Sequence, residues 1–191
     1  MRKSILLGMI CLFAGAAVSA QEIHFDTGAA KAILSPKSKL SGCEIEPTEF
    51  DGKNALRIDF NCSESLNCEF GFPPGNQVLL KDPVPKIVVK VDVFLQENNK
   101  ASRLCLRLQD SGNEVFQYRA TLPSGTKGWT TITYEINPEG KQPESWGDAK
   151  NRQLDWPIRI FGFSVGGFEK NPEGVGFIGL GPIAIIMGDK E

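Results

Sequence analysis

The chain has 191 residues and a formal net charge of −2, from 21 lysines and arginines against 23 aspartates and glutamates. This balance gives no bias toward the phosphates of nucleic acid or toward anionic lipid. The length suits one ordinary domain that can bury a real core.

The first twenty residues have the pattern of a secretory signal peptide. Met1-Arg2-Lys3 is basic, Ile5–Ala17 is apolar, and Val18-Ser19-Ala20 fits a small-residue cleavage site. The apolar run is shorter than the ~20 residues that a transmembrane anchor needs, and no later segment is apolar enough to span. We therefore expect residues 1–20 to be removed and residues 21–191 to form a single secreted or periplasmic domain. That domain keeps 19 basic and 23 acidic residues, a net charge of −4.

Apolar and polar residues then alternate in about ten short segments, which predicts antiparallel strands with one buried face. The alternation is clearest in 102–136, where Leu104, Leu106 and Leu108 alternate with arginines and a cysteine. Turns rich in Gly, Asn, Asp and Pro separate the segments, and no amphipathic helix or repeat is evident. The expected strands cover 22–26, 31–34, 40–46, 54–61, 66–72, 87–95, three within 102–136, 157–168 and 175–187.

This pattern predicts an all-β fold, a two-sheet antiparallel β-sandwich of the jelly-roll type. The longest irregular segment is 137–155, which we expect to be a loop and which carries Trp146. Long loops in compact domains are often functional.

Four cysteines remain after signal cleavage, and four cysteines allow three pairings. Export makes disulfides plausible. A hairpin at Asp51-Gly52 would bring Cys43 near Cys62 and leave Cys68 to pair with Cys105. A local Cys62–Cys68 bridge is the rival arrangement, and the sequence does not choose between them.

The order of these segments resembles carbohydrate-binding-module-like, galactose-binding-like jelly rolls of secreted proteins. The resemblance covers nearly all of 22–187, and four pieces carry it: GKNALRI at 52–58, LRLQD at 106–110, GWTTI at 128–132 and LDWPIRIFG at 154–162. It implies a β-sandwich that binds a polysaccharide or oligosaccharide without catalysis and without a cofactor.

Many relatives in this resemblance end with an aspartate-bearing strand that helps to hold a structural calcium. The matching segment here, Phe177–Ile183, has no carboxylate. Glu22 and Asp26 could supply oxygen ligands, but calcium usually takes six or more. The sequence therefore gives only weak support for a structural calcium.

Outward-facing polar residues and one tryptophan are the candidate ligand contacts. Arg, Gln and Asp offer donors and acceptors for sugar hydroxyls or a uronic carboxylate, and an aromatic ring offers sugars a stacking platform. The rival interpretation is a plain solvated face. Trp129 and Trp156 are expected to pack at the core or rim, and Phe116 and Tyr118 in the core. The six candidates on a concave sheet face and its loops are Trp146, Arg107, Arg119, Gln117, Arg103 and Asp92.

No catalytic motif stands out. The chain has one histidine, His24, which we interpret as an ordinary strand residue rather than a triad member. The leading hypothesis is a non-catalytic glycan binder. The alternatives are a structural or adhesion domain that contacts another secreted or envelope protein, and a small glycan-active hydrolase or lyase using two carboxylates.

Overall fold

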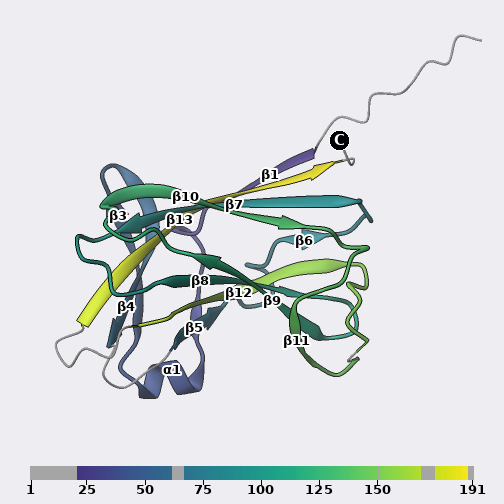
Figure 1. The fold of residues 1–191 in the computed structure, drawn as a ribbon, viewed down its shortest axis with the longest axis horizontal. Helices are drawn as coiled ribbons and strands as arrows, with labels where there is room; N and C mark the ends of the chain where they lie inside the picture. The colour runs from purple at the N-terminus through teal and green to yellow at the C-terminus, as the bar shows by residue number, and fades with distance from the viewer. Residues whose placement is uncertain (1–20, 62–66, 150, 169–174, 189–191) are drawn as a thin grey trace, which may run out of the picture.

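The computed structural model describes residues 21–61, 67–149, 151–168 and 175–188. The expected signal peptide at 1–20 and Cys62 lie outside the described residues. Figure 1 shows two layers of strands facing each other. The strands form two antiparallel sheets, so the predicted all-β sandwich is confirmed.

The first sheet has β13 (Val175–Gly188) at its centre. One edge of β13 pairs with β7 (Lys86–Leu95), and β7 pairs with the edge strand β10 (Gly128–Ile136). The other edge of β13 is shared by two strands: its first half pairs with β4 (Lys53–Asn61) and its second half with β1 (Gln21–Phe25). The outermost strand beside β4 is β3 (Glu44–Phe50).

The second sheet is built around β8 (Arg103–Gln109) and β12 (Ile158–Gly166). On the β8 side, β9 (Glu114–Thr121) and then β11 (Glu144–Gly147) follow. On the β12 side, β5 (Asn67–Gly71) and β2 (Ile33–Leu34) follow, while β6 (Leu79–Leu80) pairs with the start of β12.

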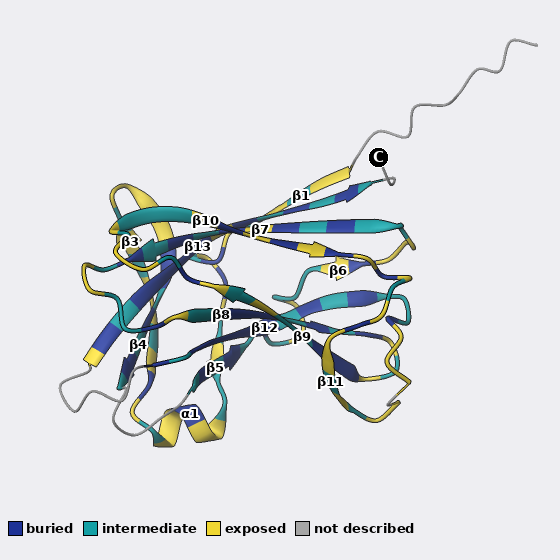
Figure 2. Cartoon of the chain, in the orientation of Figure 1, coloured by how far each residue is buried: buried dark blue, intermediate teal, exposed yellow. Residues whose placement is uncertain are grey.

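The core lies between the sheets and is made by the inward half of each alternating strand, drawn dark blue in Figure 2. The leucines of β8 face it from the second sheet, and Val89, Val91 and Val93 of β7 face it from the first. Phe116 is fully buried and Tyr118 packs against this core, as the sequence predicts. Because one face of each sheet is used for the core, the outward residues of both sheets remain for solvent or ligand.

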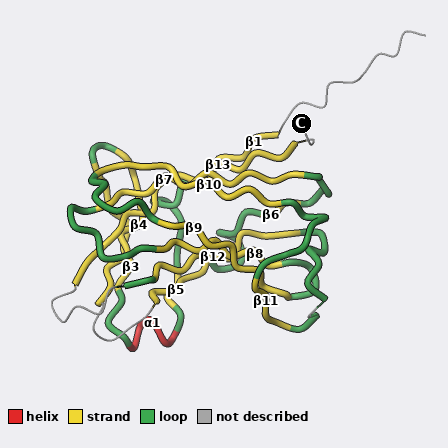
Figure 3. Tube along the Cα trace, in the orientation of Figure 1, coloured by secondary structure: helices red, strands yellow, loops and turns green. Residues whose placement is uncertain are grey.

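Several local features differ from the predicted elements: β3 covers Glu44–Phe50 instead of 40–46, and β6 was not expected. A short helix, α1 (Pro36–Leu40), separates β2 from β3, with Ser35 as its N-cap and Pro36 in its first turn. It is the one helix in the described part of the chain (red in Figure 3), and no helix there is long and apolar enough to cross a membrane. The predicted loop 137–155 contains β11, so Trp146 lies on an edge strand.

The described cysteines are free, and one predicted bridge is wrong. Cys68 faces the core from β5, whereas Cys105 lies between inward-facing leucines of β8 and therefore faces outward. Two residues on opposite faces of one sheet cannot direct their Cβ atoms toward each other. The Cys68 thiol is instead hydrogen-bonded to that of Cys43.

Candidate ligand-binding face

The outward side of the second sheet gathers most of the predicted ligand contacts, and we call it the open face. Each member lies at an outward position set by the alternation of its strand, or by direct pairing with such a position on the next strand. The open face comprises Ile33, Glu69, Arg103, Cys105, Arg107, Gln109, Gln117, Arg119, Glu144, Trp146, Arg159 and Phe161.

Arg107 holds the centre of the open face. Its Nε donates to Oε1 of Gln117 at 3.0 Å, and its Nη2 donates to Oε1 of Glu69 at 2.7 Å. The guanidinium also lies 5.2 Å from the ring of Trp146. Only 11% of the Arg107 side chain is exposed, so these contacts fix its position and link three strands.

Aromatic rings lie on both sides of this arginine. Trp146 on β11 is 40% exposed, and Phe161 on β12 is half-buried. Three inter-strand steps separate β11 from β12, a span of roughly 14 Å. A ligand touching both rings would therefore have to be longer than one sugar ring.

Phe161 lies on the open face next to a β-bulge in β12. The pairing register of β12 with β8 shifts between Ile160 and Gly162, so both Ile160 and Phe163 face the core although three positions separate them. Phe161 faces outward at the bulge, and its ring lies over the side-chain-free Gly71 of β5. Gly71 of β5 and Gly162 of β12 are direct pairing partners, which lets these two strands approach closely at this point.

Cys105 also lies on this face, beneath the arginine side chains. Burial raises the pKa of its thiol and outweighs the opposite influence of Arg103, Arg119 and Arg107. The thiol is therefore protonated at neutral pH and is a poor nucleophile.

Five of the six predicted candidates share the open face, and Asp92 does not. Asp92 is on β7, outward on the first sheet, where it accepts hydrogen bonds from Lys53 Nζ at 3.2 Å and from Thr131 Oγ1 at 2.8 Å. Alternation within a strand predicts that a residue faces outward, but it cannot say on which sheet.

Trp129 also belongs to the first sheet. It packs edge-on against Phe50 and Phe94, which stack on each other at 4.4 Å. Its indole N–H donates to the carbonyl oxygen of Phe50. Trp129 therefore packs on the outer surface of the first sheet, while Trp156 lies partly buried against the core.

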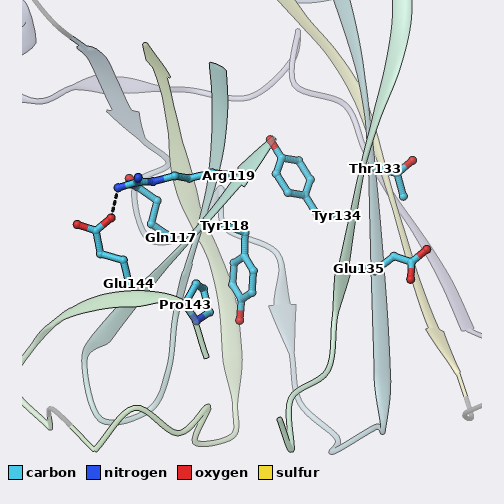
Figure 4. A pocket seen from close by; sticks show the side chains of 8 residues that line it. All are labelled: Gln117, Tyr118, Arg119, Thr133, Tyr134, Glu135, Pro143 and Glu144. Carbon is cyan, nitrogen blue, oxygen red and sulfur yellow. Dashed lines mark hydrogen bonds and ion pairs between the residues drawn. The ribbon is translucent and has the colours of Figure 1, made fainter. Parts of the chain in front are cut away.

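A hollow of about 530 Å³ lies at the edge where β9 and β11 approach β10. Figure 4 shows Tyr118 and Tyr134 between the two sheets and the Arg119–Glu144 ion pair at the rim. Most of the polar groups here already have partners within the protein. Tyr118 donates to Gln142, and Tyr134 donates to the Leu104 carbonyl. This edge hollow therefore offers a ligand fewer free polar groups than the open face.

The two residues expected as possible calcium ligands, Glu22 and Asp26, have neighbours of their own. Glu22 lies 3.4 Å from His24, and Asp26 accepts the backbone N–H of Gly28. Four positions along an extended chain separate the two carboxylates by roughly 13 Å. Within the described ranges, no group of three or more His, Cys, Asp or Glu side chains is arranged to hold a metal.

Two residues of the open face were missed from the sequence as ligand contacts, Phe161 and Arg159. Both lie beside the bulge and line a hollow of about 490 Å³ with Gln109 and Arg107. The segment LDWPIRIFG shows an Arg and a Phe at outward spacing, but the bulge itself leaves no distinctive sequence signal.

No protein-family model matches the sequence, and no curated protein matches it. Among solved structures, the chain is similar to the family 11 carbohydrate-binding module from Clostridium thermocellum in complex with a β-1,3-1,4-mixed-linked tetrasaccharide. The identity is 13%, the TM-score is 0.51, and 94% of each chain is covered. The resemblance to carbohydrate-binding-module-like sandwiches is thereby confirmed for the fold.

Two larger proteins contain a similar sandwich. One is the arabinose-bound MgGH51 α-L-arabinofuranosidase, with 13% identity, a TM-score of 0.51 and 85% of this chain covered. The other is PfGH50B, with 10% identity, a TM-score of 0.56 and 86% of this chain covered. This chain spans only 26% and 24% of their lengths, about a quarter of each.

Proposed function

We propose that this protein is a non-catalytic glycan-binding domain and that the glycan lies along the open face. The observation that carries the proposal is the placement of Trp146 and Phe161 on either side of a strip of arginine and glutamine side chains. The fold shared with a carbohydrate-binding module supports it. Fold alone does not fix function, so the chemistry of the face has to carry the case.

That chemistry suits a sugar chain. Sugars have apolar C–H faces that pack on aromatic rings and hydroxyl rims that need donors and acceptors. Trp146 and Phe161 offer the rings. Gln109 and Gln117 offer amides, and Arg107 is held rigid by its contacts, which lowers the entropy cost of binding.

The state of the acidic residues supports a binding role over hydrolysis. Glycoside hydrolysis needs two carboxyl groups free to flank the scissile bond. The two glutamates of the open face are each held by an arginine, Glu69 by Arg107 and Glu144 by Arg119. We further propose export to the periplasm or beyond, on the pattern of residues 1–20.

The first test is affinity electrophoresis of the purified protein against a panel of polysaccharides. We expect saturable retardation by one glycan class, and loss of it in Trp146→Ala and in Phe161→Ala. Trp129→Ala, which changes the same residue type on the other sheet, is the control and should bind as the wild type does. Circular dichroism verifies that each variant is folded.

Calcium and a chelator should give equal retardation, because ring packing and hydrogen bonds from arginine and glutamine N–H groups need no metal ion. A folded protein that ignores neutral and acidic glycans alike would refute the proposal. A structural or adhesion domain that contacts another protein would then become the leading hypothesis.

A further inference from the structure

The open face is positively charged although the chain as a whole is not. Four arginines lie on it, at positions 103, 107, 119 and 159, against two glutamates, at 69 and 144. The surplus is two positive charges on a chain whose net charge is −2. A field of this sign attracts anions to the face and repels them from the rest of the surface.

The four arginines differ in how far the protein neutralises them. Arg107 and Arg119 each have a glutamate partner. Arg103 donates only to the neutral amide oxygen of Asn67, at 3.3 Å. The side chain of Arg159 has no hydrogen bond or ion pair within the part of the chain that the structure describes, and its Nε is buried without an acceptor.

Leaving a buried, charged donor without a partner costs stability, so an arginine in this state is ready for an external acceptor. Its position favours a ligand as that acceptor. Arg159 lines the hollow of about 490 Å³ on the open face, together with Phe161, Gln109 and Ile33. An aromatic ring, an amide and an unpaired guanidinium thus converge on one concavity.

We propose that the open face binds an acidic glycan and that the anionic group of one sugar unit pairs with Arg159. The sugar ring packs on Phe161, and Gln109 hydrogen-bonds its hydroxyls. A planar guanidinium forms two parallel hydrogen bonds with a carboxylate, so a uronic acid matches it well, and a sulfate ester offers the same charge. This inference rests on the proposed glycan-binding function and specifies its ligand class.

The test compares acidic polysaccharides with neutral versions of themselves. Polygalacturonate is paired with its carboxyl-reduced form, and a sulfated galactan with its desulfated form, in affinity electrophoresis and titration calorimetry. The wild-type protein should prefer one acidic member by about tenfold or more, and Arg159→Gln should lose that preference. The control Lys90→Gln removes one charge from the outward side of the first sheet and should keep the preference for the acidic polysaccharide.

The outcomes separate recognition of an acidic group by Arg159 from glycan binding itself. A preference for polygalacturonate over its reduced form identifies a carboxylate, and a preference for the sulfated galactan identifies a sulfate. Equal affinity for the acidic and neutral forms would overturn the inference while leaving glycan binding intact. A preference that survives in Arg159→Gln but not in Lys90→Gln would also overturn it, whereas no binding to any glycan would remove the proposed function itself.

Discussion

Arginines 107 and 119 lie on the same face of the second sheet, yet their surroundings differ. The Arg107 side chain is 11% exposed and shares hydrogen bonds with Gln117 and Glu69. Arg119 and its partner Glu144 are 52% and 56% exposed. A part-buried guanidinium with several fixed acceptors contributes more to stability than an exposed ion pair, which solvent screens.

The substitution Arg107→Gln should therefore lower the free energy of unfolding by about 1–3 kcal/mol, because it removes two charge-assisted hydrogen bonds and leaves Glu69 without its cation. The same change at Arg119 should cost about 0.5 kcal/mol or less. Urea denaturation followed by tryptophan fluorescence measures both. Equal losses in the two variants would show that Arg107 does not organise the open face.

At the scale of the element, the bulge in β12 determines what the open face offers. An unbroken period of two would place residues 158, 160, 162 and 164 in the core and would leave 163 outside. The bulge instead buries Phe163 and Val165, while Phe161 stays on the outward side beside Arg159. Gly162 makes this possible, because a Cβ there would lie 2.2 Å from the Phe70 carbonyl oxygen.

Gly162→Ala should consequently destabilise the fold by about 1–3 kcal/mol and weaken glycan binding through displacement of Phe161. Gly71→Ala is the graded comparison, since its nearest backbone atom, the Phe161 carbonyl oxygen, would be 3.2 Å from the new Cβ. Gly71→Ala should lower the free energy of unfolding by less than Gly162→Ala does. Thermal and urea denaturation of both variants test the order, and a Gly162→Ala protein as stable as Gly71→Ala would contradict the close approach of β12 to β5.

For the whole molecule, the sequence predicts the architecture better than the site. Alternation in segments such as 102–108 identifies strands and their buried sides, because burial of one face imposes it directly. Nothing in the alternation shows which strands share a sheet. Asp92 and Arg107 therefore have the same outward pattern in the sequence although they lie on different sheets. The bulge beside Phe161 is hidden for a related reason, since one extra residue changes the side chains' direction without changing composition.

The cysteines show the same limit, because their neighbours depend on how the two sheets meet. Cys43 directly precedes β3 of the first sheet, and Cys68 lies in β5 of the second. Ser38 of α1 joins the two segments: its carbonyl accepts the Cys43 N–H, and its hydroxyl accepts the N–H of Glu69. The Cys68 thiol donates its hydrogen bond to Cys43, and this contact, together with burial, raises the pKa of the Cys68 thiol.

Two hydrogen-bonded thiols that join opposite sheets are positioned to form a disulfide in an oxidising compartment. Oxidised glutathione would accept the two electrons: its own sulfur–sulfur bond breaks, its two sulfurs take the two thiol protons, and the bond between Cys43 and Cys68 forms. The bridge would close a loop of about 25 residues and stabilise the fold by on the order of 3 kcal/mol in the chain-entropy description. Urea denaturation with and without a reductant should show that difference in the wild type and in Cys105→Ser, but not in Cys43→Ser or Cys68→Ser. If the difference persisted in Cys43→Ser, another cysteine would complete the bridge and this pairing would be wrong.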